Sequence, residues 1–293
     1  GALIADTMPP SMLTAAMSIG RTTSDTARIF GALTGAGLFA AIGMGQSYIA
    51  ITIFYALGAL LTWNAVMPKS ASAEEAAADA AERQPSPWRE LAEGIVLVWN
   101  TPRLLAIVWY ALLFNFAVFP LTNGLLPYAA KEIYRIDQTG LGYLVASVAF
   151  GAFVGSIGMS YSGVRVELAR IMIVSAVIWH ALVRGFAQMT TMASGIVMLM
   201  LCGFFQSLTM VSHTVILLST SSQRYRGRIM GVRMLAIYSL PLGLLAAGAL
   251  IGLIGFRATV SFYAIVGFTV TILIAIKWRA ALWQAQPADS VLA

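Results

Sequence analysis

Charged residues are scarce in this sequence. Of its 293 residues, 10% are Asp, Glu, Lys or Arg, whereas 59% are hydrophobic and the mean hydropathy is +0.82. A water-soluble protein carries roughly a quarter of its residues as charged side chains, because these cover the surface that faces water. The shortage of charge therefore excludes an ordinary soluble globular protein.

Cysteine and histidine are almost as rare. The sequence has one cysteine, Cys202, inside an apolar run, and two histidines, His180 and His213. A single cysteine excludes a disulfide framework, and neither histidine has a partner ligand at helical spacing. We therefore expect no metal site and no cofactor. The lack of clustered His, Asp or Glu also argues against an enzyme.

The excess of basic residues does not point to nucleic acid. The formal net charge is +6, and a basic cluster can bind nucleic acid, an acidic partner or a membrane surface. Here the basic residues separate long apolar runs. We therefore expect a lipid bilayer as a partner and no nucleic acid.

Several long stretches contain no charged residue at all. A helix that spans a membrane needs ~20 largely apolar residues, and helices of soluble proteins seldom reach that length without a charge. Two stretches are too long for one helix and break near residues 43–47 and 188–195. The pattern predicts an all-α membrane protein with about eight transmembrane helices and a helix stub before them. The predicted helices cover residues 12–42, 47–67, 104–129, 139–161, 168–187, 194–218, 230–254 and 257–279, with the stub at 1–8.

Lysine and arginine divide unequally between the two sides of the predicted membrane. Cytoplasmic loops are enriched in these residues, so the richer side is the cytoplasmic one. Thirteen fall on one side and four on the other. The thirteen include Arg21 and the cluster Arg224, Arg226, Arg228 and Arg233. This count predicts that the C-terminal tail, residues 281–293, lies in the cytoplasm.

A hydrophilic stretch, residues 68–103, divides the chain. It begins with the polar, low-complexity segment "KSASAEEAAADAAERQ" and continues as "SPWRELAEGIVLVW". The second segment predicts an amphipathic helix along the cytoplasmic membrane surface, because Trp88, Leu91, Ile95 and Val98 share one face.

The position of this linker predicts the domain organisation. Residues 1–67 would end one helix bundle, and residues 104–280 would form a second bundle of about six helices. The sequence starts at Gly1 rather than Met, and its first residues read like the end of a helix. We therefore expect an N-terminally truncated chain from a plan of two six-helix repeats.

An internal similarity supports the repeat. The segment "GALTGAGLFAAIG" at residues 31–43 matches "GLLAAGALIGLIG" at residues 243–255, so that Gly43 pairs with Gly255. Glycine and leucine are common in membrane helices, so this match alone is weak.

Several segments resemble the major facilitator superfamily, in particular its drug and siderophore exporters. Residues 2–37, which begin "ALIADTMPPSML", resemble the fourth and fifth helices of that branch. Residues 86–156, which begin "SPWRELAEGIVLVW", resemble its linker helix and helices seven and eight, and "QRYRGRIMGV" resembles the loop between helices ten and eleven. Within the branch, the chain looks most like the enterobactin-exporter and macrolide-efflux group.

This resemblance implies a major-facilitator-type helical bundle, from the end of helix four to helix twelve, that works by alternating access. It implies that Arg224, Arg226 and Arg228 clasp acidic groups and helix ends in the outward-facing state. The glycine-proline motif linked to antiport in exporters is reduced here to Gly31-Ala32, which departs from the family's pattern.

Asp25 and Arg28 are three residues apart in one predicted helix, so their side chains can form an ion pair. Ionisable groups at membrane depth are costly and are candidates for function. We interpret the pair, together with Asp6 from the stub, as a gating or coupling group. A structural pair that packs two helices is the alternative.

Polar residues in two predicted helices suit the wall of a substrate cavity. Gln206 and His213 lie on a polar stripe within "FFQSLTMVSHT", and Asn115 and Asn123 lie within "NFAVFPLTNG". Hydrogen bonding between helices is the alternative for all four. His180, at a helix end, is interpreted as an interfacial residue.

Aromatic residues in the second of these helices suit a cavity for bulky substrates, although some must face lipid. They are Trp109, Tyr110, Phe114, Phe116 and Phe119. Pro120 removes a backbone hydrogen bond and should bend the same helix, which frees carbonyls that a cavity or a neighbour must satisfy.

Two glycine pairs have the GxxxG spacing that allows helices to approach closely. These pairs are Gly31 with Gly35 and Gly151 with Gly155. We expect all four glycines to act in helix packing.

Together these features predict a secondary transporter of the bacterial inner membrane. It would export an amphipathic small molecule, a siderophore or a drug, in exchange for protons, and work as a monomer. A solute importer of the same fold and a non-functional truncated remnant are the alternatives, and an integral membrane enzyme is the least favoured.

Overall fold

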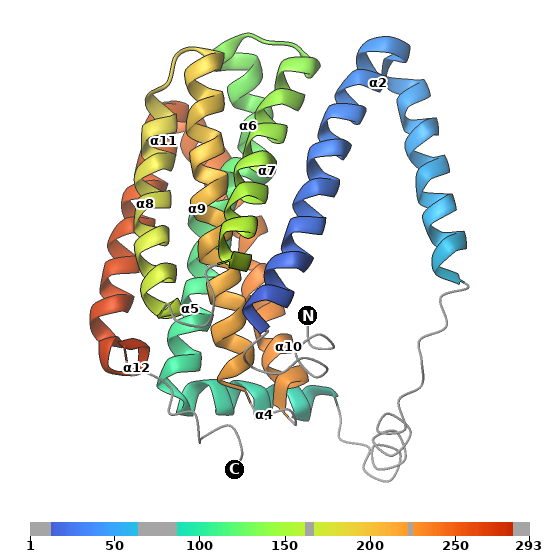
Figure 1. Ribbon diagram of the computed structural model, residues 1–293. Coiled ribbons are helices and arrows are strands. Elements are labelled where there is room, and N and C mark those ends of the chain that lie inside the picture. Colours follow the sequence, from blue (N-terminus) through green and yellow to red (C-terminus); the bar gives the residue numbers. More distant parts are fainter. Residues whose placement is uncertain (1–12, 64–86, 162–166, 222–224, 284–293) are drawn as a thin grey trace.

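The computed structural model describes residues 13–63, 87–161, 167–221 and 225–283. These residues form helices joined by short turns, and no strand occurs among them (Figure 1). Six of the described helices or helix pairs are long and apolar enough to cross a membrane. The all-α membrane fold predicted from the sequence is therefore confirmed. The predicted stub at residues 1–8 lies outside the described residues.

Two of these six segments reverse direction at a glycine. The helix α2 (Leu13–Trp63) has 51 residues, which at ~1.5 Å per residue is more than twice the ~30 Å thickness of a bilayer core. It departs from helical geometry at Gly43 (φ 77°, ψ 177°), and α11 (Ser239–Lys277) does so at Gly255 (φ 80°, ψ 166°). Glycine adopts a positive φ without the steric penalty of a Cβ atom. With these two reversals, the six segments give the eight crossings that the sequence predicts.

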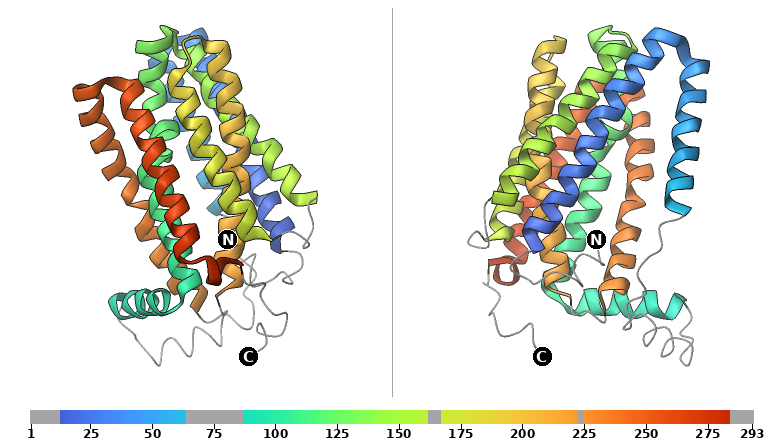
Figure 2. Two further views of the ribbon diagram at one scale, coloured as in Figure 1. Left: turned by 90° about the vertical axis from the view of Figure 1, so that its left-hand side faces the viewer. Right: turned by 45° about the vertical axis from the view of Figure 1, so that its right-hand side comes forward.

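Gly43 and Gly255 are the last paired positions of the two similar segments in the sequence. In the structure both glycines carry the chain from one long helix into the next, with nearly the same backbone angles. Figure 1 shows the reversal of α2 at one end of the molecule, and Figure 2 shows that of α11. The weak similarity in sequence therefore corresponds to a real structural equivalence.

The core of the bundle is built on close contact between α7 (Gln138–Tyr161) and α9 (Met192–Ser219). A Cβ atom at Gly151 would overlap the carbonyl group of Met200, and one at Gly155 would lie 2.6 Å from the carbonyl oxygen of Phe204. On the other helix, Gly203 faces the carbonyl group of Val148 equally closely. Gly151 and Gly155 thus occupy the packing positions expected of them. The helix α8 (Leu168–Gln188) covers the other side of α9.

Gly31 and Gly35 face no neighbouring helix among the described residues, so the packing role expected of them stays a prediction. A Cβ atom at either position would meet no described atom within 4 Å. The first arm of α2, residues 13–42, instead approaches α7 through Ala36, whose Cβ atom lies directly opposite Gly142. Neighbouring positions on a helix point in directions ~100° apart, so the face that α2 turns toward α7 is not the face that carries Gly31 and Gly35.

The helix α5 (Pro102–Ala117) is interrupted close to Pro120, where a bend is predicted. The chain continues through two π-helical segments and one α-helical turn: η2 (Leu121–Leu125), α6 (Leu126–Tyr128) and η3 (Ala129–Tyr134). Proline has no N–H group to donate to the carbonyl four residues earlier, which here belongs to Phe116. That carbonyl lies against Gly243 of α11. A neighbouring helix therefore covers the backbone that the proline leaves without a donor.

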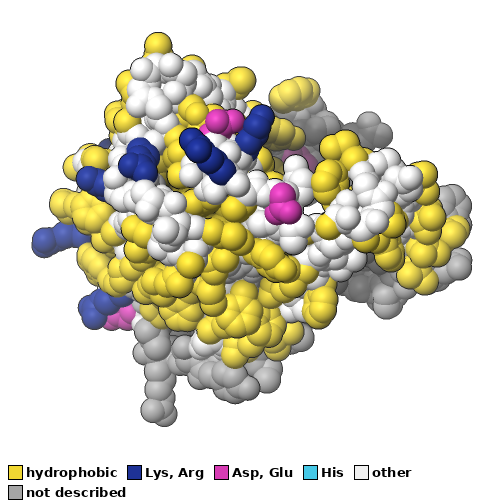
Figure 3. Space-filling view, turned by 90° about the horizontal axis from the view of Figure 1, so that it is seen from above, with side chains coloured by type: hydrophobic (Ala, Val, Ile, Leu, Met, Phe, Trp, Pro, Cys, Tyr) yellow, Lys and Arg dark blue, Asp and Glu magenta, His cyan; other side chains and the backbone are white. Residues whose placement is uncertain are grey.

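The second arm of α2, residues 44–63, stands apart from the bundle in Figure 1 and in the right view of Figure 2. Its large apolar side chains are mostly exposed, for example Phe54 at 63% and Leu61 at 79%. Seen from above, charged side chains form only small groups among hydrophobic and uncharged atoms (Figure 3). The exposed apolar side chains of the second arm suit lipid tails or another apolar helix rather than water.

The predicted amphipathic helix is present as α4 (Pro87–Asn100), which crosses the end of the bundle where α10 (Arg226–Ile237) begins (Figure 1). Its predicted apolar face is only half right. Leu91 and Val98 pack against the bundle, whereas Trp88 and Ile95 are 76% and 43% exposed. The helix is rotated because Gly94 faces α10, where a Cβ atom would lie 3.0 Å from the carbonyl oxygen of Arg228. The short helix α12 (Arg279–Trp283) ends the described chain.

Candidate functional site

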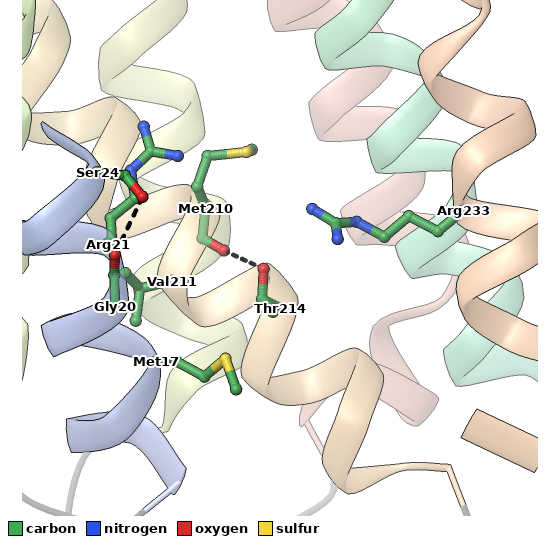
Figure 4. Close-up of a pocket in the computed structure, with 8 residues that line it drawn as sticks. All are labelled: Met17, Gly20, Arg21, Ser24, Met210, Val211, Thr214 and Arg233. Atoms are coloured by element: carbon green, nitrogen blue, oxygen red, sulfur yellow. Dashed lines mark hydrogen bonds between the residues drawn. The ribbon is translucent and has the colours of Figure 1, made fainter. Parts of the chain in front are cut away.

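Two adjoining cavities open between the first arm of α2 and the helices α5, α9 and α10. Their volumes are about 320 and 270 Å³, and both are lined by Arg21, Met210 and Arg233. Because they share these three residues, we treat them as two parts of one site, which we call the central cavity. Figure 4 shows the first part, with Arg21 on α2 and Arg233 on α10 at opposite sides.

Four of the five predicted cavity residues line the second part of the central cavity. These are Asn115, Phe119, Asn123 and His213. They come from α5, from the irregular segment around Pro120 and from α9, so the interruption at Pro120 helps to place them. The fifth, Gln206, does not line the cavity. Its side chain is 2% exposed and lies within the bundle, in neither part of the central cavity.

The two asparagines are held by their own helix. Asn115 Nδ2 donates to the carbonyl oxygen of Ala111 at 2.8 Å, and Asn123 Nδ2 donates to that of Phe119 at 3.0 Å. Each amide is thus fixed by a carbonyl four residues earlier. This arrangement leaves the amide oxygen of each side chain, and the second N–H of Asn115, available to a ligand.

His213 is almost completely buried, with 2% of its surface exposed. Its Nε2–H group donates to the carbonyl oxygen of Ile107 at 3.0 Å, and Nδ1 has no hydrogen-bond partner among the described residues. The ring meets the edge of Phe114 with centroids 6.1 Å apart. His213 therefore joins α9 to α5 at the cavity wall and keeps one polar atom without a protein partner.

The other histidine, His180, is not interfacial as predicted. It is fully buried, its Nδ1 lies 2.6 Å from the carbonyl oxygen of Ala176, and its ring fills the space beside Gly267 of α11. Of the predicted aromatic set, Phe114 and Phe119 line the central cavity, whereas Trp109 and Phe116 are 45% and 38% exposed.

Asp25 lies between two arginines on α2. Arg21 Nε lies 3.0 Å from Asp25 Oδ2, and Arg28 Nη1 lies 3.6 Å from Asp25 Oδ1. The carboxylate side chain is 1% exposed, against 26% for Arg21 and 39% for Arg28. The predicted pair is thus part of a triad that includes Arg21. Asp6, the third predicted member, lies outside the described residues.

Sequence reasoning missed Arg21 and Arg233 as cavity residues, because both were counted with the cytoplasmic loops. Arg21 is four residues before Asp25, and Arg233 is five residues beyond Arg228 within the helical stretch after the basic cluster. The spacing of Arg21 to Asp25 was the available signal, because residues four apart share a helix face.

The basic cluster contacts the linker helix. Arg228 Nη1 lies 2.8 Å from Glu93 Oε2, and Arg228 Nη2 lies 3.8 Å from Glu90 Oε1. The guanidinium also stacks over the ring of Tyr225 at 5.3 Å. Arg226 begins α10, and Arg224 lies outside the described residues. The acidic partner expected for this cluster is therefore found, for Arg228, on α4.

We predict that Arg228→Gln lowers the free energy of unfolding by about 1–2 kcal/mol, because it breaks the ion pair between α4 and α10. Arg89→Gln is the matched control, since Arg89 contacts the same carboxylate at 3.3 Å but is 75% exposed. Its removal should cost ~0.5 kcal/mol or less. Thermal unfolding of the purified variants in detergent measures both, and equal losses would show that the contact between helices contributes nothing.

Comparison with known proteins agrees with this architecture. The Major Facilitator Superfamily model matches residues 1–240. A curated relative, described as the multidrug efflux pump Tap of Mycolicibacterium fortuitum, is 25% identical over 170 residues, which is 58% of this chain and 41% of that protein. The chain thus spans less than half the length of the relative it matches. Because the family match covers most of the chain, this protein belongs to the Major Facilitator Superfamily of membrane transporters.

Proposed function

We propose that this protein exports an amphipathic small molecule, a drug or a siderophore, by alternating access. The observation that supports this proposal most is the central cavity, which lies between the first arm of α2 and the second bundle. Its wall combines aromatic rings, Phe114 and Phe119, with the amides of Asn115 and Asn123. A wall of this kind suits a ligand with an apolar body and a few polar groups. The efflux direction rests on the name of the distant relative.

Import of an organic acid is the second candidate. The observation in its favour is the pair of arginines, Arg21 and Arg233, on the wall of the central cavity. Charged groups of this kind suit a hydrophilic acidic solute as well as an exported anion. The two candidates differ in the direction of movement and share the cavity.

We propose that transport is coupled to protons through Asp25. Among the described residues of the spanning helices, Asp25 is the one carboxylate that is buried. Its partner Arg21 also lines the cavity, so a ligand that engages Arg21 changes the surroundings of the carboxylate. Exporters of this kind carry a glycine-proline motif that is linked to antiport, and this chain has Gly31-Ala32 in its place. The proposed antiport step therefore rests on Asp25.

The membrane arrangement is proposed on the same basis. The protein would be a monomer in the bacterial inner membrane, with two bundles separated by residues 68–103. The exposed Trp88 and Trp99 of α4 suit the headgroup region, and the side of the membrane on which α4 lies would be the cytoplasm. A reporter fused after Lys277 should be active in the cytoplasm. A periplasmic signal would contradict this topology.

Inside-out vesicles from cells that produce the protein test the direction and the coupling. An exporter should accumulate a fluorescent amphipathic probe in the vesicle lumen when the lumen is acidified, and a proton uncoupler should release it. An importer should deplete the same probe from the lumen. No gradient-dependent movement of neutral, anionic or cationic probes would contradict secondary transport.

A further inference from the structure

Arg233 is a cation without a counter-charge in the part of the chain that the structure describes. No described carboxylate lies within ion-pair distance of it, although it lines both parts of the central cavity. Charged side chains inside membrane-spanning helices are costly unless they are paired or face water or a ligand. The position of Arg233 therefore calls for an anionic partner that enters the cavity.

Arg21 faces the same space, and two of its three guanidinium nitrogens are available to a ligand. Only its Nε atom contacts Asp25, at 3.0 Å, and no described acceptor engages its two Nη groups. Figure 4 shows that Arg21 extends from α2 and Arg233 from the opposite side, α10. Two guanidinium groups on facing walls can hold one carboxylate or phenolate between them, since each presents donors in a planar fork.

The described residues that line the cavity include no acidic side chain that would neutralise these charges. Asp25 is the nearest described carboxylate on α2, and it is already shared between Arg21 and Arg28. The net charge of the described residues that line the cavity is therefore positive. Electrostatic attraction is stronger in such a partly buried site than in water, because the effective dielectric constant is lower.

A second observation points to a ligand at the same place. His213 is 2% exposed, lines the same part of the cavity as both arginines, and leaves Nδ1 without a described partner. Phe114, Phe119 and Leu240 line the same part of the cavity and are apolar. The site thus combines positively charged and polar groups with aromatic and aliphatic ones.

We infer that the central cavity selects amphipathic anions, with the anionic group held between Arg21 and Arg233 and the apolar body against Phe114 and Phe119. This inference rests on the proposed transport function and adds the charge of the substrate to it. A carboxylate or phenolate on an aromatic body of drug size fits a cavity of about 270 to 320 Å³.

Three fluorescent probes of similar size test the charge preference: the anion dansyl-leucine, its neutral amide, and the cation monodansylcadaverine. Binding to the purified protein in detergent should be about tenfold tighter for the anion than for the amide, and weakest for the cation. If the amide or the cation binds as tightly as the anion, the inference is wrong although the transport proposal stands. If none of the three binds and none moves in vesicles, both are wrong.

Substitutions of single residues then show which side chains produce the preference for the anion. Arg233→Gln should weaken dansyl-leucine binding about tenfold and leave amide binding unchanged, whereas Arg233→Lys should retain part of the preference. Arg257→Gln is the control, because Arg257 is exposed and does not line the cavity. Unchanged anion binding in both Arg233→Gln and Arg21→Gln would overturn the assigned site. Retained amide binding shows that a variant is folded.

Discussion

Asp25→Ala is expected to lower the free energy of unfolding by about 3–5 kcal/mol and to abolish transport. The side chain of Asp25 is 1% exposed and lies between Arg21 and Arg28, so its removal leaves two arginines without their common counter-charge. Removing one partner of a buried ion pair costs more than the pair contributes, because the remaining charge stays desolvated. The transport defect follows from the same loss, since Arg21 would no longer be held at the cavity wall.

Glu167→Ala is the matched control for this prediction. Glu167 pairs with Arg170 three residues later, and both side chains are exposed, at 44% and 62%. An exposed pair of this kind contributes ~0–1 kcal/mol. Cys202, the single cysteine, is 1% exposed, so a thiol-reactive dye reports unfolding directly. Wild-type stability and transport in Asp25→Ala would show that the triad is neither structural nor functional. Asp25→Asn keeps the shape and separates loss of charge from loss of volume.

Gly151→Ala is expected to destabilise the bundle by about 1–3 kcal/mol or more. The added methyl group would overlap the backbone carbonyl of Met200, and a backbone group cannot move aside as a flexible side chain can. To make room, α7 and α9 must separate, and the contacts around Gly155 and Gly203 would loosen with them. The same dye-based unfolding measurement on Cys202 detects the loss.

Gly248→Ala is the control for helix propensity. A Cβ atom there meets no described atom within 4 Å, so the change should be neutral or stabilise the helix by ~1 kcal/mol. If Gly151→Ala and Gly248→Ala had the same effect, the close approach of α7 to α9 would contribute nothing to stability.

The helices and their reversals could be predicted from the sequence because membrane constraints act on local composition. Charge-free runs set the number of crossings, and the break predicted at residues 43–47 contains Gly43, where α2 reverses. Gly255 was noted only as the residue paired with Gly43 in the internal similarity. The cavity residues Asn115, Asn123 and His213 were also found, because polar groups are rare in apolar helices and stand out.

What the sequence could not show is the rotation of each helix about its axis. Gly31 and Gly35 have the same spacing as Gly151 and Gly155, yet within the described residues only the second pair faces a neighbour. Trp88 is exposed and Gln206 is buried within the bundle for the same reason, since the face that a helix presents depends on tertiary packing. Arg21 and Arg233 were counted with the cytoplasmic side because counting charges per side ignores the depth at which each charge lies.

The distance across the central cavity tests alternating access most directly. Ser24 on α2 and Ile237 on α10 line the cavity from opposite walls. Spin labels at Ser24→Cys and Ile237→Cys, in a Cys202→Ala background in liposomes, report this distance by pulsed electron resonance. We expect two populations of distances whose proportions shift when dansyl-leucine or a proton gradient is applied. If the labels report a single distance that changes neither with dansyl-leucine nor with a proton gradient, although the protein still transports the probe, alternating access through this cavity is contradicted.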